Sequence, residues 1–300
     1  MKRIILFRFH NNLTVCKNRV RLLRLHNPDI DVYGLYGGEE GNFQKVRVKF
    51  ADYLENIYCI KGKSPLWKWK NCDLAVKLWY KDYGKDIAFD VLHIIEWDML
   101  MLDTIDHIYK NISEHAIGLS ELTAINGSGD SWRWTSTDEY RAEMDKLLLF
   151  LRERFDYSNG PLRCIMGGAC LPRELIEKYS QIDIPEVCND EVRLPLIAQI
   201  FGFNIHDTGF YDRLDENKKR SFNLKRRIED AAITNELKIA GGNRVFHPYY
   251  RVYKPLSISG YLYNVQYDIT SKIKALIKTV LGQRAFKSFK SIIRKDYKNN

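Results

Sequence analysis

A mostly apolar run, Phe89 to Ile95, leads directly into the acidic triplet Glu96-Trp97-Asp98. A run of this kind predicts a strand buried on both faces, and such strands belong to parallel sheets that helices cover. Ligands of open α/β sheets bind where the strands end, so the end of this strand predicts functional surface. The feature therefore favours an α/β fold of Rossmann type, with a mostly parallel central sheet flanked by helices.

The two acids of the triplet predict a metal site. Residues two apart on a strand point to the same side, so the carboxylates of Glu96 and Asp98 are expected to converge at the strand end. Two acids at a sheet edge can also be solvated rim residues, and a match of this length often arises by chance. The apolar strand that precedes the triplet favours the interpretation as a metal site over that as solvated residues at the sheet edge.

Bulk composition allows a large globular fold. A chain of 300 residues with 45% hydrophobic content can bury a sizeable core, as one domain or two packed lobes. The first apolar run, Ile4 to Phe7, is too short for a signal peptide, and no stretch reaches the roughly 18 apolar residues of a membrane span. Six cysteines are scattered without a C-x-x-C pair, which favours reduced thiols over a zinc ribbon. We therefore expect a cytoplasmic protein.

The N-terminal order of elements is typical of a nucleotide-binding α/β layer. A strand over residues 3–9, a helix ending at Asn27-Pro28 and a second strand over residues 31–36 follow one another. A right-handed crossover would make the two strands parallel. No G-x-G-x-x-G motif follows the first strand, which argues against a dinucleotide enzyme.

The middle of the chain continues the alternation of strands and helices. Gly167-Gly168 is expected to form a tight strand-to-helix turn, or else to let a ligand approach the backbone. The other expected elements are a helix ending near Gly84, a strand over 115–125, a flexible polar loop over 126–130, a helix over 137–154, a strand over 163–166 and a helix over 172–180.

Asn189-Asp190-Glu191 precedes an apolar helical pattern that extends to Phe203. Pro195 is best tolerated in a first helical turn, which places the acids at or just ahead of the helix start. Acids there can simply cap the helix and complement its dipole. If they face a cleft, one of them could instead serve as a general base that takes a proton from an attacking hydroxyl.

A late histidine, His247, lies before Pro248 in an aromatic segment, and the proline predicts an extended backbone. A lone histidine in such a place is usually structural. Together with Glu96 and Asp98 it would complete a mixed oxygen and nitrogen site for Mn²⁺ or Mg²⁺, and the imidazole favours manganese.

The C-terminal segment carries most of the chain's positive charge. Residues 268–298 hold nine Lys or Arg and two Asp, a net +7 out of a total of +9. Apolar residues recur at helical spacing over 268–296, which predicts an amphipathic basic helix suited to an anionic membrane surface. The alternative is a helix packed on the body with a solvated lysine face. Nucleic acid is a third candidate partner, but the nearly neutral remainder of the chain does not support it.

The order of these features resembles the GT-A fold of nucleotide-sugar-dependent glycosyltransferases, as found in bacterial or viral glycan synthesis. The resemblance covers roughly residues 1–255 and is carried by Phe7-Arg8-Phe9-His10, Glu96-Trp97-Asp98, Gly167-Gly168-Ala169, Asn189-Asp190-Glu191 and His247. It implies a nucleotide-binding half at 1–110, an acceptor-binding half at 111–255 and a separate helical tail at 256–300.

The resemblance also implies roles for single residues. Asp98 and His247 would hold a divalent cation against the donor diphosphate, and Glu96, standing where that motif usually has Asp, would contact the ribose or the metal's water. Glu191 would be the base of an inverting member, with Asp190 as the alternative. The remaining expected donor contacts are Arg8, Phe9 and His10 beside the nucleobase, together with Lys70, Asp73, Trp97, Gly167 and Gly168.

These implications predict a metal-dependent, inverting glycosyltransferase. It would move a sugar from a nucleotide sugar, by family habit a UDP-sugar, to a hydroxyl of a glycan or lipid-linked acceptor, and its basic tail would hold it at the inner face of the membrane. The first alternative is a Mg²⁺-dependent nucleotidyltransferase that uses Glu96 and Asp98. The second is a non-catalytic peripheral membrane protein. The sequence does not indicate an oligomeric state.

Overall fold

The computed structural model describes residues 1–10, 12–125, 132, 134–223, 228–254 and 257–296, with side chains as far as residue 279. The predicted polar loop at 126–130 lies outside the described residues. The chain divides into two compact units, Met1–Tyr250 and Arg251–Asn300, whereas the sequence predicted a division at residue 255.

The first unit is built around a mostly parallel sheet, as expected. Its described strands, seven in all, lie in the order β3-β2-β1-β4-β7-β6-β8. Only β7 runs against its neighbours, antiparallel to both β4 and β6, while the N-terminal pair β1 and β2 is parallel as predicted. The strands are β1 (Arg3–Phe9), β2 (Asp31–Tyr36), β3 (Ile57–Cys59), β4 (Val91–Glu96), β6 (Ile117–Ala124), β7 (Leu162–Pro172) and β8 (Ile205–Asp207).

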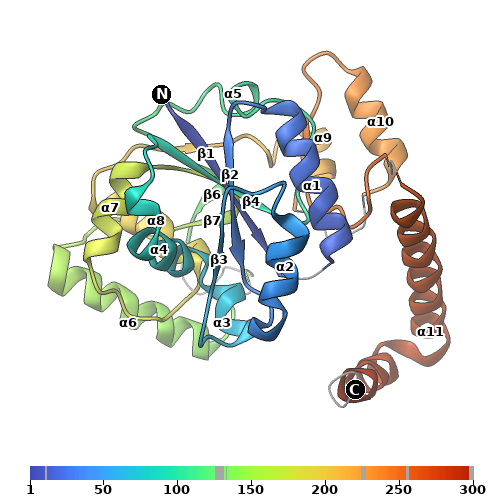
Figure 1. Cartoon of the computed structure of the whole chain (residues 1–300). Helices are drawn as coiled ribbons and strands as arrows, with labels where there is room; N and C mark the ends of the chain where they lie inside the picture. The colour runs from blue at the N-terminus through green and yellow to red at the C-terminus, as the bar shows by residue number, and fades with distance from the viewer. Residues whose placement is uncertain (11, 126–131, 133, 224–227, 255–256, 297–300) are drawn as a thin grey trace. The chain divides into compact units, whose positions relative to one another are not determined.

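Helices cover both faces of this sheet, because its central strands are apolar on both sides (Figure 1). In β1, Ile4 and Leu6 pack into one core cluster and Ile5 and Phe7 into another. The first cluster lies under α4, α6, α7 and α8, and the second under α1 and α2. The helices are α1 (Leu13–His26), α2 (Phe43–Phe50), α3 (Pro65–Lys70), α4 (Cys72–Asp82), α5 (Ile105–Ile108), α6 (Asp138–Phe155), α7 (Arg173–Gln181), α8 (Asp190–Ile200), α9 (Glu216–Ser221) and α10 (Asp230–Lys238), with short 3₁₀ turns at Glu40–Asn42 and Gly84–Asp86.

The predicted turn at Gly167-Gly168 is wrong, because β7 continues through both glycines to Pro172. Gly168 has a φ of +78° and lies in the strand opposite an irregular stretch of β6, where the pairing register shifts. A side chain at Gly168 would meet the ring of Phe210 at 2.7 Å, so the site requires glycine for both its conformation and its packing.

The predicted place of Pro195 is also wrong. It lies inside α8, beyond the first turn that begins at Asp190. Proline has no N–H to give to the carbonyl four residues earlier, which here belongs to Glu191. The thiol of Cys164 on β7 donates to that carbonyl over 3.5 Å and compensates for the missing bond.

A small second sheet explains how the late histidine reaches the acidic triplet. β5 (Leu100–Met101) and β9 (Val245–Phe246) pair antiparallel, with Leu100 opposite Phe246. The backbone N–H of Tyr249 donates to the carbonyl of Asp98 over 2.7 Å and extends the same contact. The segment that carries His247 is thus fixed beside the end of β4.

The second unit contains α11 (Ile258–Asp296), the helix expected for the tail, although it begins well before residue 268. Its first half exposes apolar side chains at successive spacings of three and four, which places them in one stripe along the helix. They are Ile258, Leu262, Val265, Ile269, Ile273 and Leu276. Among the helices of the described residues, none is long and apolar enough to span a bilayer.

Candidate active site

Two adjoining cavities open where β1 and β4 end. The larger has a volume of about 510 Å³ and the smaller about 370 Å³. Both are lined by Arg8, Trp69, Glu96, Asp98 and Tyr250, which therefore lie where the two cavities meet. The cavities thus open at the strand ends, the place where ligands of open α/β sheets bind.

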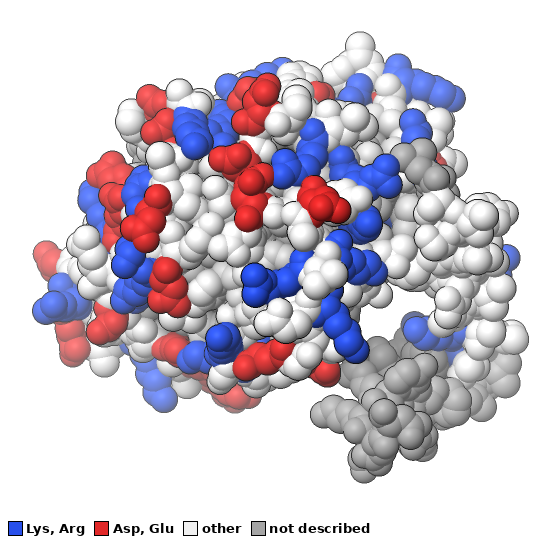
Figure 2. Space-filling view, in the orientation of Figure 1, with Lys and Arg blue, Asp and Glu red and all other residues white. Residues whose placement is uncertain are grey.

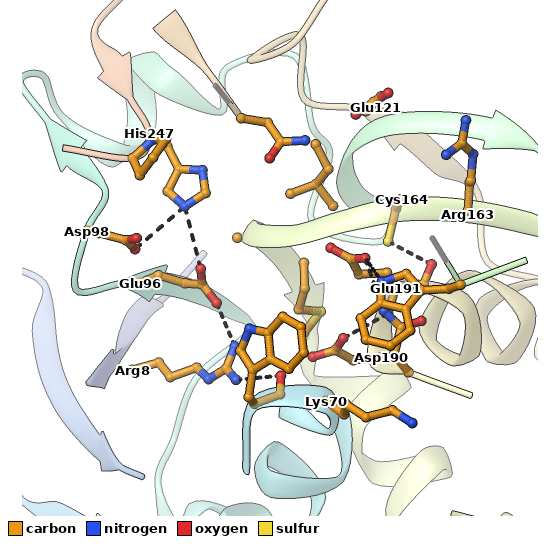
Figure 3. Close-up of a pocket in the computed structure, with 18 of the residues that line it drawn as sticks. Arg8, Lys70, Glu96, Asp98, Glu121, Arg163, Cys164, Asp190, Glu191 and His247 are labelled. Carbon is orange, nitrogen blue, oxygen red and sulfur yellow. Dashed lines mark hydrogen bonds and ion pairs between the residues drawn. The ribbon is translucent and has the colours of Figure 1, made fainter. Parts of the chain in front are cut away.

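The acidic triplet and the late histidine converge at the join of the cavities. Glu96, Asp98 and His247 each offer one ligand atom, and these atoms lie within 4.8 Å of one another. β4 ends at Glu96, so Asp98 reaches the cluster through a turn closed by a hydrogen bond from Met99 N to Glu96 O, and not along the strand as predicted. Figure 3 shows the three side chains on one side of the larger cavity.

The spacing within this cluster fits a divalent cation. His247 Nε2 lies 3.7 Å from Glu96 Oε2 and 3.5 Å from Asp98 Oδ1, longer than good hydrogen bonds. Asp98 Oδ1 is buried and accepts no hydrogen bond from any described residue. Burial opposes the charged imidazole, yet Asp98 and Glu96 raise the pKa of His247. Two carboxylate oxygens and one imidazole nitrogen are suitable ligands for Mn²⁺.

Arg8 lies beneath this cluster and ties it to the neighbouring helix. Its Nη1 donates to Glu96 Oε1 over 2.6 Å, and its Nη2 donates to the backbone oxygens of Lys68 and Trp69. One oxygen of Glu96 thus binds Arg8 while the other faces His247. Both cavities include Arg8 in their lining, which puts its charge beside the cluster and not only beside a nucleobase as predicted.

Gly167 faces the same cluster from β7. A Cβ atom at this position would lie 3.4 Å from Glu96 Oε2 and 3.5 Å from the sulfur of Met99. The bare backbone therefore leaves space beside a candidate metal ligand. Gly167 lines the larger cavity, as expected for a position where a ligand approaches the backbone.

On the opposite side of the larger cavity lies the start of α8 (Figure 3). Glu191 Oε2 accepts hydrogen bonds of 3.0 Å from Trp134 Nε1 and from Asn189 Nδ2. Burial and then the charge of Asp190 raise the pKa of Glu191 to about 8. A carboxyl with a pKa in this range can take a proton near neutral pH, as a general base requires.

Asp190 has a different environment from Glu191. Its Oδ2 accepts from the backbone N–H of Cys72 at the start of α4, and its Oδ1 accepts from the backbone N–H of Glu191. Burial raises the pKa of Asp190, the charge of Arg8 lowers it in part, and the resulting pKa is about 7. Because both oxygens bind backbone amides, Asp190 joins two helix starts, and Glu191 is better placed to react.

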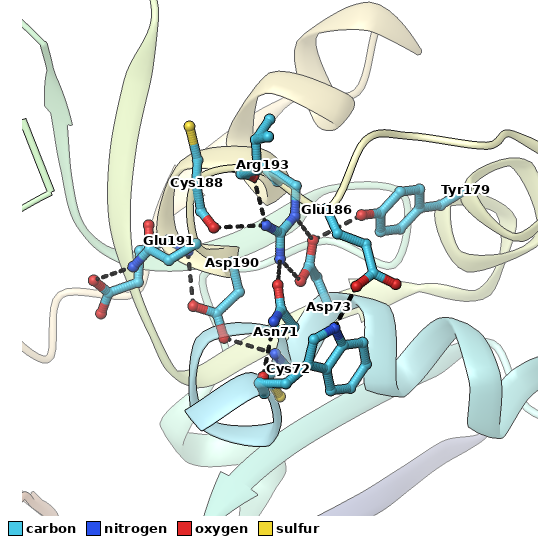
Figure 4. A network of polar contacts seen from close by, with 12 residues as sticks. Asn71, Cys72, Asp73, Tyr179, Glu186, Cys188, Asp190, Glu191 and Arg193 are labelled. Carbon is cyan, nitrogen blue, oxygen red and sulfur yellow. Dashed lines mark hydrogen bonds and ion pairs between the residues drawn. The ribbon is translucent and has the colours of Figure 1, made fainter. Parts of the chain in front are cut away.

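A buried ion pair lies next to the contact between the starts of α4 and α8 (Figure 4). Arg193 donates to both oxygens of Asp73, over 2.6 and 2.9 Å, and to Asn71 Oδ1 over 2.7 Å. Tyr179 also donates to Asp73, whose side chain has no exposed surface. The structure therefore does not bring Asp73 to either cavity, although the sequence suggested a donor contact there.

The other expected donor contacts fall into two groups. Phe9, His10 and Trp97 line the smaller cavity, where Trp97 packs against the rings of His10 and Tyr250. Lys70 lines the larger cavity instead, with its Nζ 3.6 Å from Glu143 and over the rings of Trp134 and Tyr140. Gly168 is next to the cavity lining in β7 but is not part of it.

Sequence reasoning missed the aromatic part of the larger cavity. Trp69, Trp132 and Trp134 all line it, and the guanidinium of Arg163 lies 4.9 Å from the ring centre of Trp132. The signal available in the sequence was the spacing of two pairs, Trp67-Lys-Trp69 and Trp132-Arg-Trp134. Nothing in one sequence indicates that these pairs meet.

Comparison with known proteins gives matches among solved structures only. No protein-family profile and no curated protein matches the sequence. The crystal structure of S. aureus TarS covers 69% of this chain and 35% of its own, at 14% identity and a TM-score of 0.38. TarS 1–349 in complex with UDP covers 69% of this chain and 57% of its own, at 13% identity and a TM-score of 0.38.

Two further matches have comparable scores. Galactosyltransferase LgtC in complex with donor and acceptor sugar analogs covers 60% of each chain, at 14% identity and a TM-score of 0.32. The 4-diphosphocytidyl-2C-methyl-D-erythritol synthase of Anaerococcus prevotii covers 69% of this chain and 86% of its own, at 8% identity and a TM-score of 0.36. This chain spans between 35% and 58% of the TarS chains it matches. The function proposed below therefore rests on the residues of the cavities.

Proposed function

We propose that the protein is a GT-A-type, metal-dependent, inverting glycosyltransferase. One observation carries the proposal: a single cavity has a metal-binding set on one side and a carboxyl with a raised pKa on the other. Glu96, Asp98 and His247 form the set, and Glu191 is the carboxyl. A sugar donor bound through its diphosphate at the first side would present its anomeric carbon to an acceptor held at the second.

Each group has a defined task in this reaction. A bound Mn²⁺ or Mg²⁺ would neutralise charge on the leaving diphosphate. Asp98, His247 and Glu96 would hold that ion, and Arg8 adds a fixed positive charge beside it. Glu191 takes the proton of the acceptor hydroxyl. At the same time the oxygen of that hydroxyl forms the new bond to the anomeric carbon, and the nucleoside diphosphate departs. One displacement of this kind inverts the anomeric centre.

The donor in this proposal is a UDP-sugar, as the resemblance implies, with its nucleotide in the smaller cavity. The rings of His10, Trp97 and Tyr250 offer flat surfaces there for a base. The acceptor is a glycan or a lipid-linked sugar in the larger cavity.

The test is a transfer assay with purified protein, a panel of nucleotide sugars and Mn²⁺, followed by detection of the released nucleotide. We expect a nucleoside diphosphate, with loss of release in EDTA and in Glu191→Gln. Release of pyrophosphate from a nucleoside triphosphate would instead identify a nucleotidyltransferase. Absence of nucleotide binding in a thermal-shift screen would favour the non-catalytic alternative.

We further propose that α11 attaches the enzyme to an anionic membrane at the cytoplasmic face. The exposed apolar stripe of its first half supports this, since Ile269 is 53% exposed and Ile273 is 51% exposed. Basic side chains that include Lys272, Lys274 and Lys278 lie on the same helix and would add electrostatic attraction of about 1 kcal/mol each.

Vesicle co-sedimentation tests this attachment. We expect the full chain to bind vesicles that contain phosphatidylglycerol more strongly than neutral phosphatidylcholine vesicles. Ile269→Asp should weaken binding, whereas Ser271→Asp, which adds the same charge away from the stripe, should have a smaller effect. Equal binding by wild type and Ile269→Asp would contradict the proposal.

A further inference from the structure

The larger cavity has an aromatic wall formed by Trp69, Trp132 and Trp134. Trp69 comes from α3 and the other two from the segment before α6, so residues far apart in sequence build one surface. The ring centres of Trp69 and Trp134 lie 5.5 Å apart, with their planes at 49°. Half of the Trp69 side chain is exposed, at 50%. An exposed indole in a cavity is a surface available to a ligand.

The aromatic wall ends at the proposed base. Trp134 is 8% exposed and donates its indole N–H to Glu191 Oε2. Among the described residues, both hydrogen bonds to this carboxylate engage Oε2, which leaves Oε1 for the proton of an acceptor. A group that packs on the wall therefore has its edge beside the atom that would deprotonate it.

The charges of the cavity favour an uncharged group on this wall. Three basic residues line the cavity besides His247, namely Arg8, Lys70 and Arg163, and the acidic residues that line it are Glu96, Asp98, Glu121, Asp190 and Glu191. Each of the three basic groups already has a partner, since Arg8 binds Glu96, Lys70 lies 3.6 Å from Glu143, and Arg163 lies over Trp132. An acceptor phosphate or carboxylate would have to displace one of these partners to gain a cation in this cavity.

An uncharged pyranose ring matches both the aromatic wall and the charges of the cavity. One of its faces carries only C–H groups and can pack on an indole, while its rim carries hydroxyls that can reach a carboxylate. We propose that the acceptor is an uncharged pyranose that stacks on Trp69, next to Trp134, with the reacting hydroxyl directed at Glu191. This inference rests on the proposed function, because it assigns the acceptor class of the same cavity.

The experiment has two arms. In the first, thermal shift with UDP and Mn²⁺ tests the donor site alone. In the second, saturation-transfer NMR measures binding of methyl pyranosides with gluco, galacto and N-acetylglucosamine configurations to the protein with UDP and Mn²⁺ present. Glycerol and methyl glucuronide serve as an acyclic probe and a charged probe.

Variants separate stacking from folding. Trp69→Ala should weaken binding of the preferred methyl pyranoside about tenfold, and Trp69→Phe should retain most of it, because a smaller ring still offers a flat face. Trp67→Ala is the matched control, since Trp67 lies on the same helix but lines neither cavity and hydrogen-bonds to Glu186. It should bind the pyranoside like wild type.

The outcomes are distinct. Binding of UDP without binding of any pyranoside would overturn this inference and leave the glycosyltransferase intact. Preference for methyl glucuronide over its neutral counterparts, or equal binding by wild type and Trp69→Ala, would also overturn it. Failure to bind any nucleotide would instead overturn the proposed function. Saturable pyranoside binding that Trp69→Ala weakens and Trp67→Ala does not would establish the aromatic wall as the acceptor site.

Discussion

Trp134 Nε1 and Glu191 Oε2 form a hydrogen bond of 3.0 Å that joins the aromatic wall of the larger cavity to its proposed base. The bond has two consequences. It engages Oε2 and so leaves Oε1 for the proposed acceptor, and it stabilises the anionic form of a carboxyl whose pKa burial has raised. Both consequences can be measured once transfer is assayed.

The first prediction concerns the pH dependence of transfer. Glu191 must be deprotonated to act as a base, and its pKa is raised to about 8. We therefore expect kcat/KM to rise with pH and to level off above about pH 8. Glu191→Gln should lower kcat by about 10²- to 10⁴-fold and remove this dependence. A profile that stays flat from pH 6 to 9 would exclude Glu191 as the base.

The second prediction concerns Trp134→Phe. This change keeps an aromatic face but removes the hydrogen bond to Glu191. Because the lost donor had stabilised the carboxylate, the midpoint of the pH profile should move upward, and kcat should fall while the KM for the nucleotide sugar stays the same. A fall in kcat with an unmoved midpoint would show that Trp134 supports only the shape of the cavity.

The third prediction concerns the metal set. Asp98→Asn and His247→Ala should each weaken Mn²⁺ binding at least about tenfold, because each removes one of three candidate ligands. Electron paramagnetic resonance of free Mn²⁺ gives the affinity without an activity assay. Asp103→Asn is the control, since Asp103 forms an acid–histidine pair with His107 at 2.6 Å but lines neither cavity. An equal loss in Asp103→Asn would show that the effect is not specific.

How much of this could be predicted from the sequence varies with the kind of contact. The apolar strand before Glu96 indicated the sheet and the edge where the two cavities open, because burial on both faces leaves a continuous hydrophobic run. The convergence of Glu96 and Asp98 was expected from their spacing on a strand, although a turn after Glu96, and not the strand, brings Asp98 to the cluster. The residue types suggested that His247 completes this set, but the sequence did not show how His247 reaches it, since its approach depends on the pairing of two very short strands, β5 and β9.

Other parts of the site depend on packing that no local pattern encodes. Asp73 was expected at the donor, yet it pairs with Arg193 in the core, and one sequence does not show that these two residues meet. Gly167 was expected in a turn because glycine pairs usually mark turns, but here it lies within β7 and lines the larger cavity beside Glu96. The contact between Trp69 and Trp134 likewise depends on tertiary packing that one sequence does not show.

The fourth prediction concerns the buried pair of Arg193 and Asp73. Removing one partner leaves an uncompensated charge, which costs about 3–5 kcal/mol, so Arg193→Met should lower the free energy of unfolding by this amount. Urea denaturation measures it. Arg173→Met is the control, because its pair with Glu177 is partly exposed and should contribute no more than about 1 kcal/mol. Equal effects of the two substitutions would contradict the special role of the buried pair.

The last prediction concerns the cost in stability of the base itself. The pKa of Glu191 is raised in the folded state to about 8 from its ordinary value of 4.5, so folding favours the protonated form. Glu191 therefore costs no stability below about pH 4.5, and the cost grows by about 1.4 kcal/mol for each pH unit above that value until it levels off near pH 8. In EDTA, the free energy of unfolding of Glu191→Gln, measured by urea denaturation, should match that of wild type at pH 4.5 and exceed it at pH 8.

Glu186→Gln is the control and should be less stable than wild type at pH 8. Burial of Glu186 acts to raise its pKa, but hydrogen bonds from Trp67 and Lys63 lower the pKa overall, so the charged form of Glu186 stabilises the fold. A stability gain for Glu191→Gln that does not depend on pH would mean that the substitution improves packing and does not relieve a buried charge.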